Sequence, residues 1–212
     1  VMCMAEACGI ATVPHALIKN KDSLAYITKR VDRIGEPASL RKLAMEDFCQ
    51  LDLRLTQDKY KGSYERCAKV IDRYSSRPYF DLRELFLRII FCFITGNSDM
   101  HLKNFSLLET AEGSEEYILS PAYDLLPVNL ILPQDKEQTA LALNGKKMNL
   151  CKKDFLIFAE HCNIEKNAAE KMIHFLFSKL PKLRSLCETS LLPEEMKGQL
   201  IELIAERTSI LS

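Results

Sequence analysis

The chain has 212 residues, of which 47% are hydrophobic and 27% charged, and its 29 basic residues balance its 29 acidic residues. This apolar content excludes a disordered chain, and the presence of only 7 Gly and 8 Pro excludes collagen-like or low-complexity sequence. A net charge of zero gives no global attraction to nucleic acid, although a local basic patch could still bind it. The length predicts one substantial hydrophobic core, or one large domain with a small appendage.

Neither a membrane span nor a secretion signal is visible in the sequence. The most apolar run, residues 89–94, is six residues long, whereas spanning a bilayer takes about 20 residues. The eight cysteines form no CxxC pair, and most lie in apolar helical contexts. We interpret them as small buried hydrophobic residues of a reducing compartment, without disulfides and without a zinc site. We therefore expect a cytoplasmic protein that makes no contact with a membrane.

The first third of the chain predicts a short helix and a small strand pair. Residues 1–9 are typical of a helix end, which Gly9 stops because glycine suits the left-handed position after a helix. An extended segment at 15–19 and a strand at 24–31 flank a polar turn at 20–22. After this strand pair, the pattern is helical almost throughout.

Capping residues predict where the next helices begin. Three polar side chains precede helical patterns: Ser39 for a helix to about Leu51, Ser63 for residues 64–74 and Asp81 for residues 82–95. The segment 82–95 is apolar on nearly every face after Arg88. A helix that is apolar all round belongs in the centre of a fold, so we expect this helix to be the most buried element.

The chain beyond this central helix predicts a loop, a hairpin and a helical tail. Gly96 ends the helix, and eight mostly polar residues follow it at 97–104. Two short strands are predicted at 105–108 and 117–119, before a proline-bearing loop to about residue 138. From residue 154 onward we expect three or four amphipathic helices, broken near Asn163, Pro181 and Pro193. The predicted fold class is α+β, mainly α-helical.

The loop after the central helix carries the side chains with the clearest chemical meaning. Phosphoryl transfer from ATP requires a carboxylate that orients the accepting hydroxyl, and oxygen ligands that hold Mg²⁺ against the phosphates. Protein-kinase catalytic loops place an asparagine five residues after that aspartate, and a metal-binding aspartate follows the next strands. Asp99 and Asn104 are five residues apart, and Asp124 comes twenty residues later, across the predicted hairpin. The order and spacing therefore favour phosphoryl transfer.

Other interpretations of these residues remain open at this point. Aspartate and asparagine also satisfy backbone groups in ordinary turns, although a turn does not require Asp, His, Lys and Asn together under a core helix. A kinase for small molecules would use the same spacing, so the loop does not distinguish it from a protein kinase.

At these residues the chain resembles a known family. GNSDMHLKNFS (96–106) and SPAYDLL (120–126) closely resemble the signature of the HipA-like serine/threonine kinases, the toxin components of bacterial toxin–antitoxin pairs. Further segments resemble other parts of that family: YITKRVDR (26–33) its hinge strand with an R-x-D-R ending, KLAMEDFCQL (42–51) its E-D-x-x-Q helix, and LALNGK (141–146) its C-terminal body. The resemblance implies a protein-kinase-like C-lobe at 37–212, preceded by a remnant of the N-lobe and hinge at 1–36.

The resemblance also implies roles for the loop residues. Asp99 corresponds to the catalytic base, and Asn104 and Asp124 correspond to the ligands of Mg²⁺, so ATP and Mg²⁺ are the expected cofactors. Lys103 is a candidate catalytic residue that could place a positive charge near the transferred phosphoryl group; a purely structural role is equally compatible with the sequence. His101 is a candidate cofactor-binding residue, but we favour a structural role in which it packs under the loop and donates a hydrogen bond.

Nucleotide contacts are implied for the hinge strand. The backbone from Lys29 to Val31 would meet adenine, and Asp32 is expected near the ribose. The sequence has no G-x-G motif, and neither a phosphate-covering loop nor a strand lysine is visible. We therefore expect these parts either in a longer chain or in a separate N-terminal subunit.

The resemblance implies a serine/threonine protein kinase that acts on a protein substrate. As a toxin it would have a helix-turn-helix antitoxin as partner, and it would meet DNA only indirectly, through that antitoxin. The alternative is a non-catalytic kinase-fold module that binds an antitoxin or completes a split kinase. The persistence of Asp99, Asn104 and Asp124 argues against this alternative, because a decayed site usually loses one of them.

Overall fold

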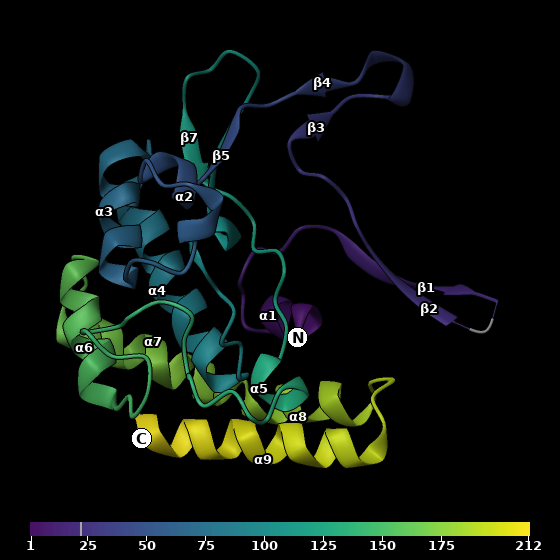
Figure 1. The fold of residues 1–212 in the computed structure, drawn as a ribbon, viewed down its shortest axis with the longest axis vertical. Helices are drawn as coiled ribbons and strands as arrows, with labels where there is room; N and C mark the ends of the chain where they lie inside the picture. The colour runs from purple at the N-terminus through teal and green to yellow at the C-terminus, as the bar shows by residue number, and fades with distance from the viewer. Residues whose placement is uncertain (22) are drawn as a thin grey trace.

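The computed structural model describes residues 1–21 and 23–212. It shows a body of helices beside a small three-stranded sheet, with a separate two-stranded hairpin that extends away from the body (Figure 1). The mainly helical α+β class predicted from the sequence is confirmed. In the described part of the chain, none of the helices combines the length and the apolar character needed to cross a membrane.

The N-terminal region follows the predicted order. Helix α1 (Met2–Ala7) ends just before Gly9, whose φ of +76° is the left-handed conformation that glycine adopts readily. Strands β1 (His15–Asn20) and β2 (Ser23–Thr28) pair antiparallel, with Leu17 opposite Tyr26. The strand ends earlier than predicted, and Asp22 of the predicted turn lies outside the described residues.

The predicted helix from Ser39 to Leu51 is wrong. The segment forms several short elements: β3 (Arg33–Ile34), the 3₁₀ turn η1 (Pro37–Ser39), β4 (Arg41–Lys42), β5 (Met45–Asp47) and α2 (Phe48–Leu51). Asp47 rather than Ser39 is the cap, because its carboxylate accepts from the Gln50 N–H at 2.9 Å while the Gln50 side chain accepts from the Asp47 N–H at 3.0 Å. Strand β5 forms because it pairs with a strand about sixty residues later in the chain, a partner that local pattern does not show.

The two long helices predicted before the loop at 97–104 are confirmed, and the start of one of them is corrected. Helix α3 (Tyr64–Tyr74) is capped by Ser63, which accepts from the Arg66 N–H at 3.3 Å. Helix α4 (Pro78–Ile94) begins four residues before the predicted start, with proline in its first turn, where a missing N–H costs nothing. Asp81 is therefore inside the helix, and the cap predicted for it is wrong.

Helix α4 is the centre of the core. It contacts α3, α6, α7, α9 and strand β7, and Phe91 and Ile94 are 1% and 2% exposed. The expectation of a buried central helix is thus confirmed.

We expect Phe91→Ala to lower the free energy of unfolding by about 3–5 kcal/mol, because it leaves a cavity in a fully packed core. Urea denaturation measures this change. Phe80→Ala is the matched control, since Phe80 lies on the same helix but is 65% exposed and its loss should cost less than about 1 kcal/mol. Equal losses for the two variants would contradict the central position of α4.

A three-stranded antiparallel sheet and a helical tail complete the fold. Strands β6 (Ser106–Glu109) and β7 (Tyr117–Leu119) form the predicted hairpin, and β5 adds a third strand beside β6. The remaining helical elements are η2 (Thr56–Asp58), η3 (Leu102–Asn104), α5 (Val128–Ile131), α6 (Lys152–His161), α7 (Lys166–Ser178), α8 (Leu180–Glu188) and α9 (Glu194–Leu211). The tail breaks at 162–165, 179 and 189–193, close to the three predicted positions. The loop 95–105 connects α4 to the sheet (Figure 1).

Candidate active site

The loop between α4 and β6 is held in one shape by its own backbone and by the side chain of Asn97. Gly96 has a φ of +70°, and a Cβ there would lie 2.5 Å from the Leu203 side chain, so no other residue fits without a shift. The Asn97 side chain accepts from the Asp99 N–H at 3.1 Å. The His101 N–H donates to the Asp99 carbonyl at 2.8 Å. These bonds fix where the Asp99 carboxylate leaves the loop.

The structure brings Asn104 and Asp124 into direct contact. The Asn104 side-chain nitrogen donates to the Asp124 carboxylate at 2.9 Å, while its oxygen accepts from the His101 N–H at 3.2 Å. Asn104 is buried and Asp124 is exposed. Asp124 has a φ of +57°, a left-handed conformation that aspartate tolerates better than most residues. A buried amide and an exposed carboxylate thus meet at the mouth of one site.

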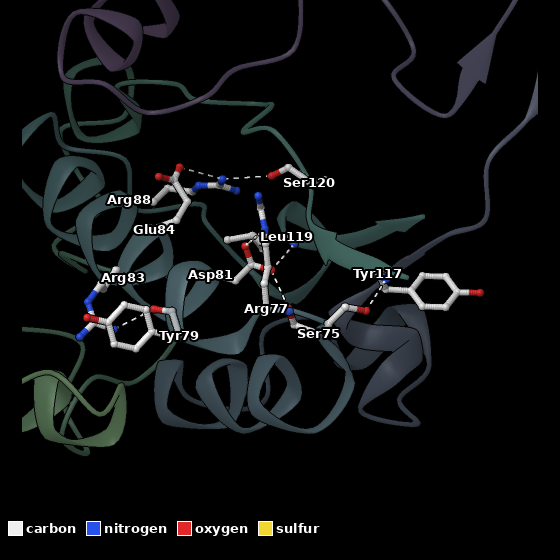
Figure 2. A network of polar contacts seen from close by, with 11 residues as sticks. Ser75, Arg77, Tyr79, Asp81, Arg83, Glu84, Arg88, Tyr117, Leu119 and Ser120 are labelled. Carbon is white, nitrogen blue, oxygen red and sulfur yellow. Dashed lines mark hydrogen bonds and ion pairs between the residues drawn. The ribbon is translucent and has the colours of Figure 1, made fainter. Parts of the chain in front are cut away.

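Two charged side chains of α4 hold the segment that leads to Asp124 (Figure 2). The Asp81 carboxylate accepts from the Leu119 N–H at 2.7 Å, and also from Ser75 and Arg77. The fully buried Arg88 donates to the Ser120 carbonyl at 3.0 Å. Sequence reasoning missed this role for both residues, although Arg88, directly before the apolar run 89–94, was the signal that could have shown it.

Asp99 faces a groove and is bound by a residue that sequence reasoning missed. The Tyr60 hydroxyl donates to the Asp99 carboxylate at 2.7 Å. Burial, followed by this hydrogen bond, raises the pKa of Tyr60 to about 12, so the phenol remains a donor at neutral pH. Tyr60 lies in the irregular stretch between α2 and α3, where no local pattern distinguishes it.

The groove beside Asp99 measures about 630 Å³. Its lining combines apolar and charged side chains: Leu126, Val128, Ile131 and Leu132 with Tyr60, Ser98, Asp99, Asp135, Glu137 and Lys147. Asp135 is held in place because its carboxylate accepts from the Ser98 hydroxyl at 2.8 Å. The groove is large enough for a peptide side chain next to Asp99.

His101 lies under the loop between the two carboxylates. It is buried, its ring packs edge-on against Tyr60 at 5.0 Å between centroids, and burial lowers its pKa against smaller opposing effects of Asp99 and Asp124. Its Nδ1 has no hydrogen-bond partner among the described residues. The bonds that shape the loop therefore come from the His101 backbone, and the ring contributes packing.

Lys103 and the E-D-x-x-Q segment are joined by an ion pair. The Lys103 ammonium contacts the carboxylate of Asp47, which caps α2. The Lys103 carbonyl accepts from the Tyr123 hydroxyl at 3.0 Å, and that hydroxyl also bonds to Ser106 at 2.6 Å. The structure thus places Lys103 between α2 and the segment that precedes Asp124.

The hinge residues border a separate hollow of about 200 Å³. Its lining is Val13, Thr28, Lys29, Arg30, Val31, Asp32, Met45 and Tyr123. Tyr123, the residue before Asp124 in the chain, forms part of this lining. Lys29 and Val31 thus share a hollow with the residue that precedes one candidate metal ligand.

Asp32 serves as the centre of the R-x-D-R motif. Its carboxylate accepts from Arg30 at 2.9 and 2.7 Å and from Arg33 at 2.7 Å. These bonds, that of Arg30 first, hold the pKa of Asp32 below its usual range. The motif therefore fixes the chain after β2, and a ribose contact would have to share a carboxylate that two arginines already bind.

The donor set of Asn104 and Asp124 fits Mg²⁺. Carboxylate and amide oxygens are the ligands that this cation prefers, and the two side chains are already within hydrogen-bond distance. The Asn104 amide nitrogen faces Asp124, so cation binding requires the amide to turn its oxygen toward the carboxylate.

Comparison with known proteins places this site in a family context. Residues 1–183 match the family described as HipA-like C-terminal domain. The chain is 24% identical over 219 residues to a "Putative kinase" of Haemophilus influenzae, covering 92% of this chain and 62% of that protein. It is 35% identical over 153 residues to "Putative kinase Y4dM" of Sinorhizobium fredii, covering 70% of this chain and 34% of that protein. The chain thus spans only part of each relative's length.

Solved structures share the fold at low sequence identity. A chain of the Shewanella oneidensis MR-1 toxin–antitoxin complex of HipA, HipB and operator DNA matches with a TM-score of 0.82 and 17% identity, over 99% of this chain and 53% of that chain. The Helicobacter pylori proinflammatory kinase CtkA matches with a TM-score of 0.67 and 17% identity, over 98% of this chain and 77% of that chain. These likenesses confirm the predicted kinase-like fold.

Proposed function

Since this chain belongs to the HipA-like C-terminal domain family, we propose that it is the catalytic portion of a serine/threonine protein kinase. The reaction is the transfer of the γ-phosphoryl group of Mg-ATP to a protein hydroxyl. Residues 37–212 are the C-lobe in this proposal, and residues 1–36 are the hinge and a remnant of the N-lobe. The kinase names of the relatives support it.

One observation carries the proposal: the Asn104 side chain contacts the Asp124 carboxylate at 2.9 Å. Asn104 lies on the same loop as Asp99. Asp99 orients the acceptor hydroxyl and accepts its proton, as a half-buried carboxylate in the wall of an open groove can do. Asn104 and Asp124 hold Mg²⁺, which when bound neutralises charge on the phosphates. Lys29 and Val31 border the hollow for adenine.

Three further assignments stay predictions: Asp32 and His101 at the cofactor, and Lys103 as a catalytic residue. Asp32 near the ribose would have to share its arginine-bound carboxylate. Lys103 can reach a phosphoryl group only when its ion pair with Asp47 opens. The His101 N–H donates to the Asn104 side-chain oxygen at 3.2 Å, which supports a place beside a proposed metal ligand even though the His101 ring is buried.

The acceptor is a polypeptide in this proposal, seated in the groove beside Asp99. Leu126, Ile131 and Leu132 expose 45%, 54% and 45% of their surface there. Exposed aliphatic side chains around a candidate base are suited to the apolar parts of a peptide chain rather than to a sugar.

The exposed apolar surface of the β1–β2 hairpin supports the expectation that further N-lobe strands pack against it. Its large apolar side chains are exposed on both faces: Leu17, Ile18, Leu24, Tyr26 and Ile27, each between 44% and 55%. An isolated two-stranded hairpin is marginally stable in water and gains stability from further strands or a covering helix. We propose that N-lobe strands cover it, supplied by a longer chain or by a separate N-terminal subunit.

The complete protein is, in this proposal, the toxin of a toxin–antitoxin pair. Its partner is a helix-turn-helix antitoxin, through which alone it meets DNA, and the fold likeness to a chain of the HipA, HipB and operator DNA complex supports this. A cytoplasmic location is also proposed, and the eight free cysteines agree with a reducing compartment.

Phosphate transfer from labelled ATP tests the proposal, with the N-lobe present beside this domain. We expect Mg-dependent labelling of serine or threonine, and a rise in thermal stability with Mg-ATP, equivalent to about 2.7 kcal/mol at 100 times Kd. If neither labelling nor stabilisation is observed, the kinase proposal is overturned and the non-catalytic module is favoured.

Tyr60→Phe tests whether the tyrosine orients Asp99. Loss of a hydrogen bond to a charged group costs about 1.5–3 kcal/mol; Tyr60 is partly exposed, so we expect the low end and a fall in kcat of about tenfold, with little change in KM for Mg-ATP. Tyr79→Phe is the control, because Tyr79 is an exposed tyrosine on α4 outside the groove. An unchanged kcat in Tyr60→Phe would show that Asp99 needs no such support.

A further inference from the structure

A second cluster of potential ligands lies outside the candidate active site, where α1 meets the start of β1. Among the described residues, Cys3, Glu6 and His15 are the one group of three cysteine, histidine or acidic side chains whose ligand atoms all lie within 4.8 Å of one another. Cys3 and Glu6 are three residues apart on α1 and so share a face of the helix. His15 is the first residue of β1.

His15 is oriented as a metal-binding histidine usually is. Its side chain is 9% exposed, and its Nδ1 lies 3.0 Å from the Val13 carbonyl. A carbonyl can only accept, so Nδ1 carries the proton and Nε2 is left with a lone pair. Metal-ligating histidines typically donate their second ring N–H to a backbone carbonyl in this manner.

The lone pair of Nε2 faces the Cys3 sulfur at 3.5 Å. Zinc bonds to sulfur at about 2.3 Å and to nitrogen at about 2.0–2.1 Å, and at a tetrahedral angle these bonds place the two ligand atoms about 3.6 Å apart. The observed separation is therefore within about 0.1 Å of that expected for two ligands on one tetrahedral cation.

Glu6 completes the set from the same helix face. Its Oε1 lies 3.8 Å from Nδ1 of His15, on the far side of the ring from the Nε2 lone pair, and accepts from the Thr12 hydroxyl at 2.8 Å. The carboxylate therefore has to rotate to reach an ion bound at Nε2. The side chain is 54% exposed, so it can turn a carboxylate oxygen toward the cation without repacking the core. A set of one thiolate, one imidazole and one carboxylate suits Zn²⁺, a borderline-soft cation, better than it suits Mg²⁺, which prefers oxygen ligands alone.

We propose that Cys3, Glu6 and His15 bind one Zn²⁺ ion, with water in the fourth position. The ion joins α1 to the base of the β1–β2 hairpin and so fixes the direction in which the hairpin leaves the body. A cysteine and a histidine twelve residues apart match no common ligand spacing, which is why the sequence alone indicates no zinc site.

Cobalt(II) and zinc titrations of the purified, tag-free 212-residue chain test the proposal. We expect one equivalent of Co²⁺ to give a thiolate-to-cobalt absorption band that zinc displaces, and zinc to raise the melting temperature. Cys3→Ser and His15→Gln should each abolish the band and weaken zinc binding by at least about 100-fold. Cys151→Ser is the matched control, because Cys151 is also exposed and free, and it should leave both unchanged.

Retention of the band in Cys3→Ser, or its loss in Cys151→Ser, would overturn the proposal. An absence of the band in the unsubstituted chain would also overturn it and leave Cys3 as a simple hydrogen-bond donor to His15. If Cys3→Ser fails to fold, His15→Gln decides by the same spectroscopic reading. None of these readings depends on kinase activity.

Discussion

Asp124→Ala is expected to abolish phosphoryl transfer and to weaken Mg-dependent nucleotide binding, because it removes the exposed carboxylate that meets Asn104. Removal of one electrostatic contact to developing charge typically costs about 10²–10³ in kcat, and loss of the cation adds to it. The measurement is Mg-ATP affinity by calorimetry together with single-turnover transfer, in a protein in which the N-lobe accompanies this domain.

Backbone conformation requires a second variant at this position. Asp124 has a φ of +57°, and an alanine there costs about 1–2 kcal/mol of stability for reasons unrelated to a metal. Asp124→Asn avoids most of this cost, because asparagine also tolerates left-handed backbone, yet it removes the charge that holds the cation. Unchanged Mg-ATP affinity in both variants would contradict the metal-ligand role.

The same position shows what sequence reasoning could and could not reach. The pairing of Asn104 with Asp124 was predictable, because the nineteen residues between them contain a hairpin that returns the chain to its start. The hydrogen bonds of Asp81 and Arg88 that hold the segment before Asp124 were not predictable in this way. Asp81 has the local pattern of a helix cap, and only the β7 backbone, 38 residues later, shows why its carboxylate is buried.

Long-range pairing also explains the main error in the fold. Residues 39–51 carry a helical pattern, yet β5 forms within them because β6 offers a complete set of backbone partners. Tertiary hydrogen bonding overrides a weak local preference when the segment is short. By contrast α4 was predictable, since its apolar residues cover nearly every face and only a central position buries them all.

The loop residue Tyr60 marks the limit of motif reasoning. The signature residues 96–106 indicate Asp99 as the candidate base, but the side chain that donates to its carboxylate comes from a segment 39 residues earlier with no secondary-structure pattern. Asp32 gives a second example. The R-x-D-R motif is visible in the sequence, but only the structure shows that both arginines donate to the same Asp32 carboxylate.

Asp99→Asn should lower kcat by about 10²–10⁴-fold, the range over which a general base contributes, while Mg-ATP affinity stays near that of the unsubstituted protein. The asparagine keeps the side chain's size and an oxygen that accepts from the Tyr60 hydroxyl, so the loop should keep its shape. What it loses is the negative charge that takes the proton of the acceptor hydroxyl. An interaction needed only in the transition state lowers kcat without changing ground-state binding.

Asp72→Asn is the control for this change, because Asp72 is an exposed aspartate on α3 and the substitution is chemically identical. We expect it to leave kcat, KM and thermal stability unchanged. The Asp124 variants are expected to lose both Mg-ATP binding and phosphoryl transfer, whereas Asp99→Asn is expected to lose transfer alone. This difference separates a metal ligand from a catalytic base. Full transfer activity in Asp99→Asn would remove the catalytic base from the proposed mechanism, and a non-catalytic module that binds a partner would then explain the domain better.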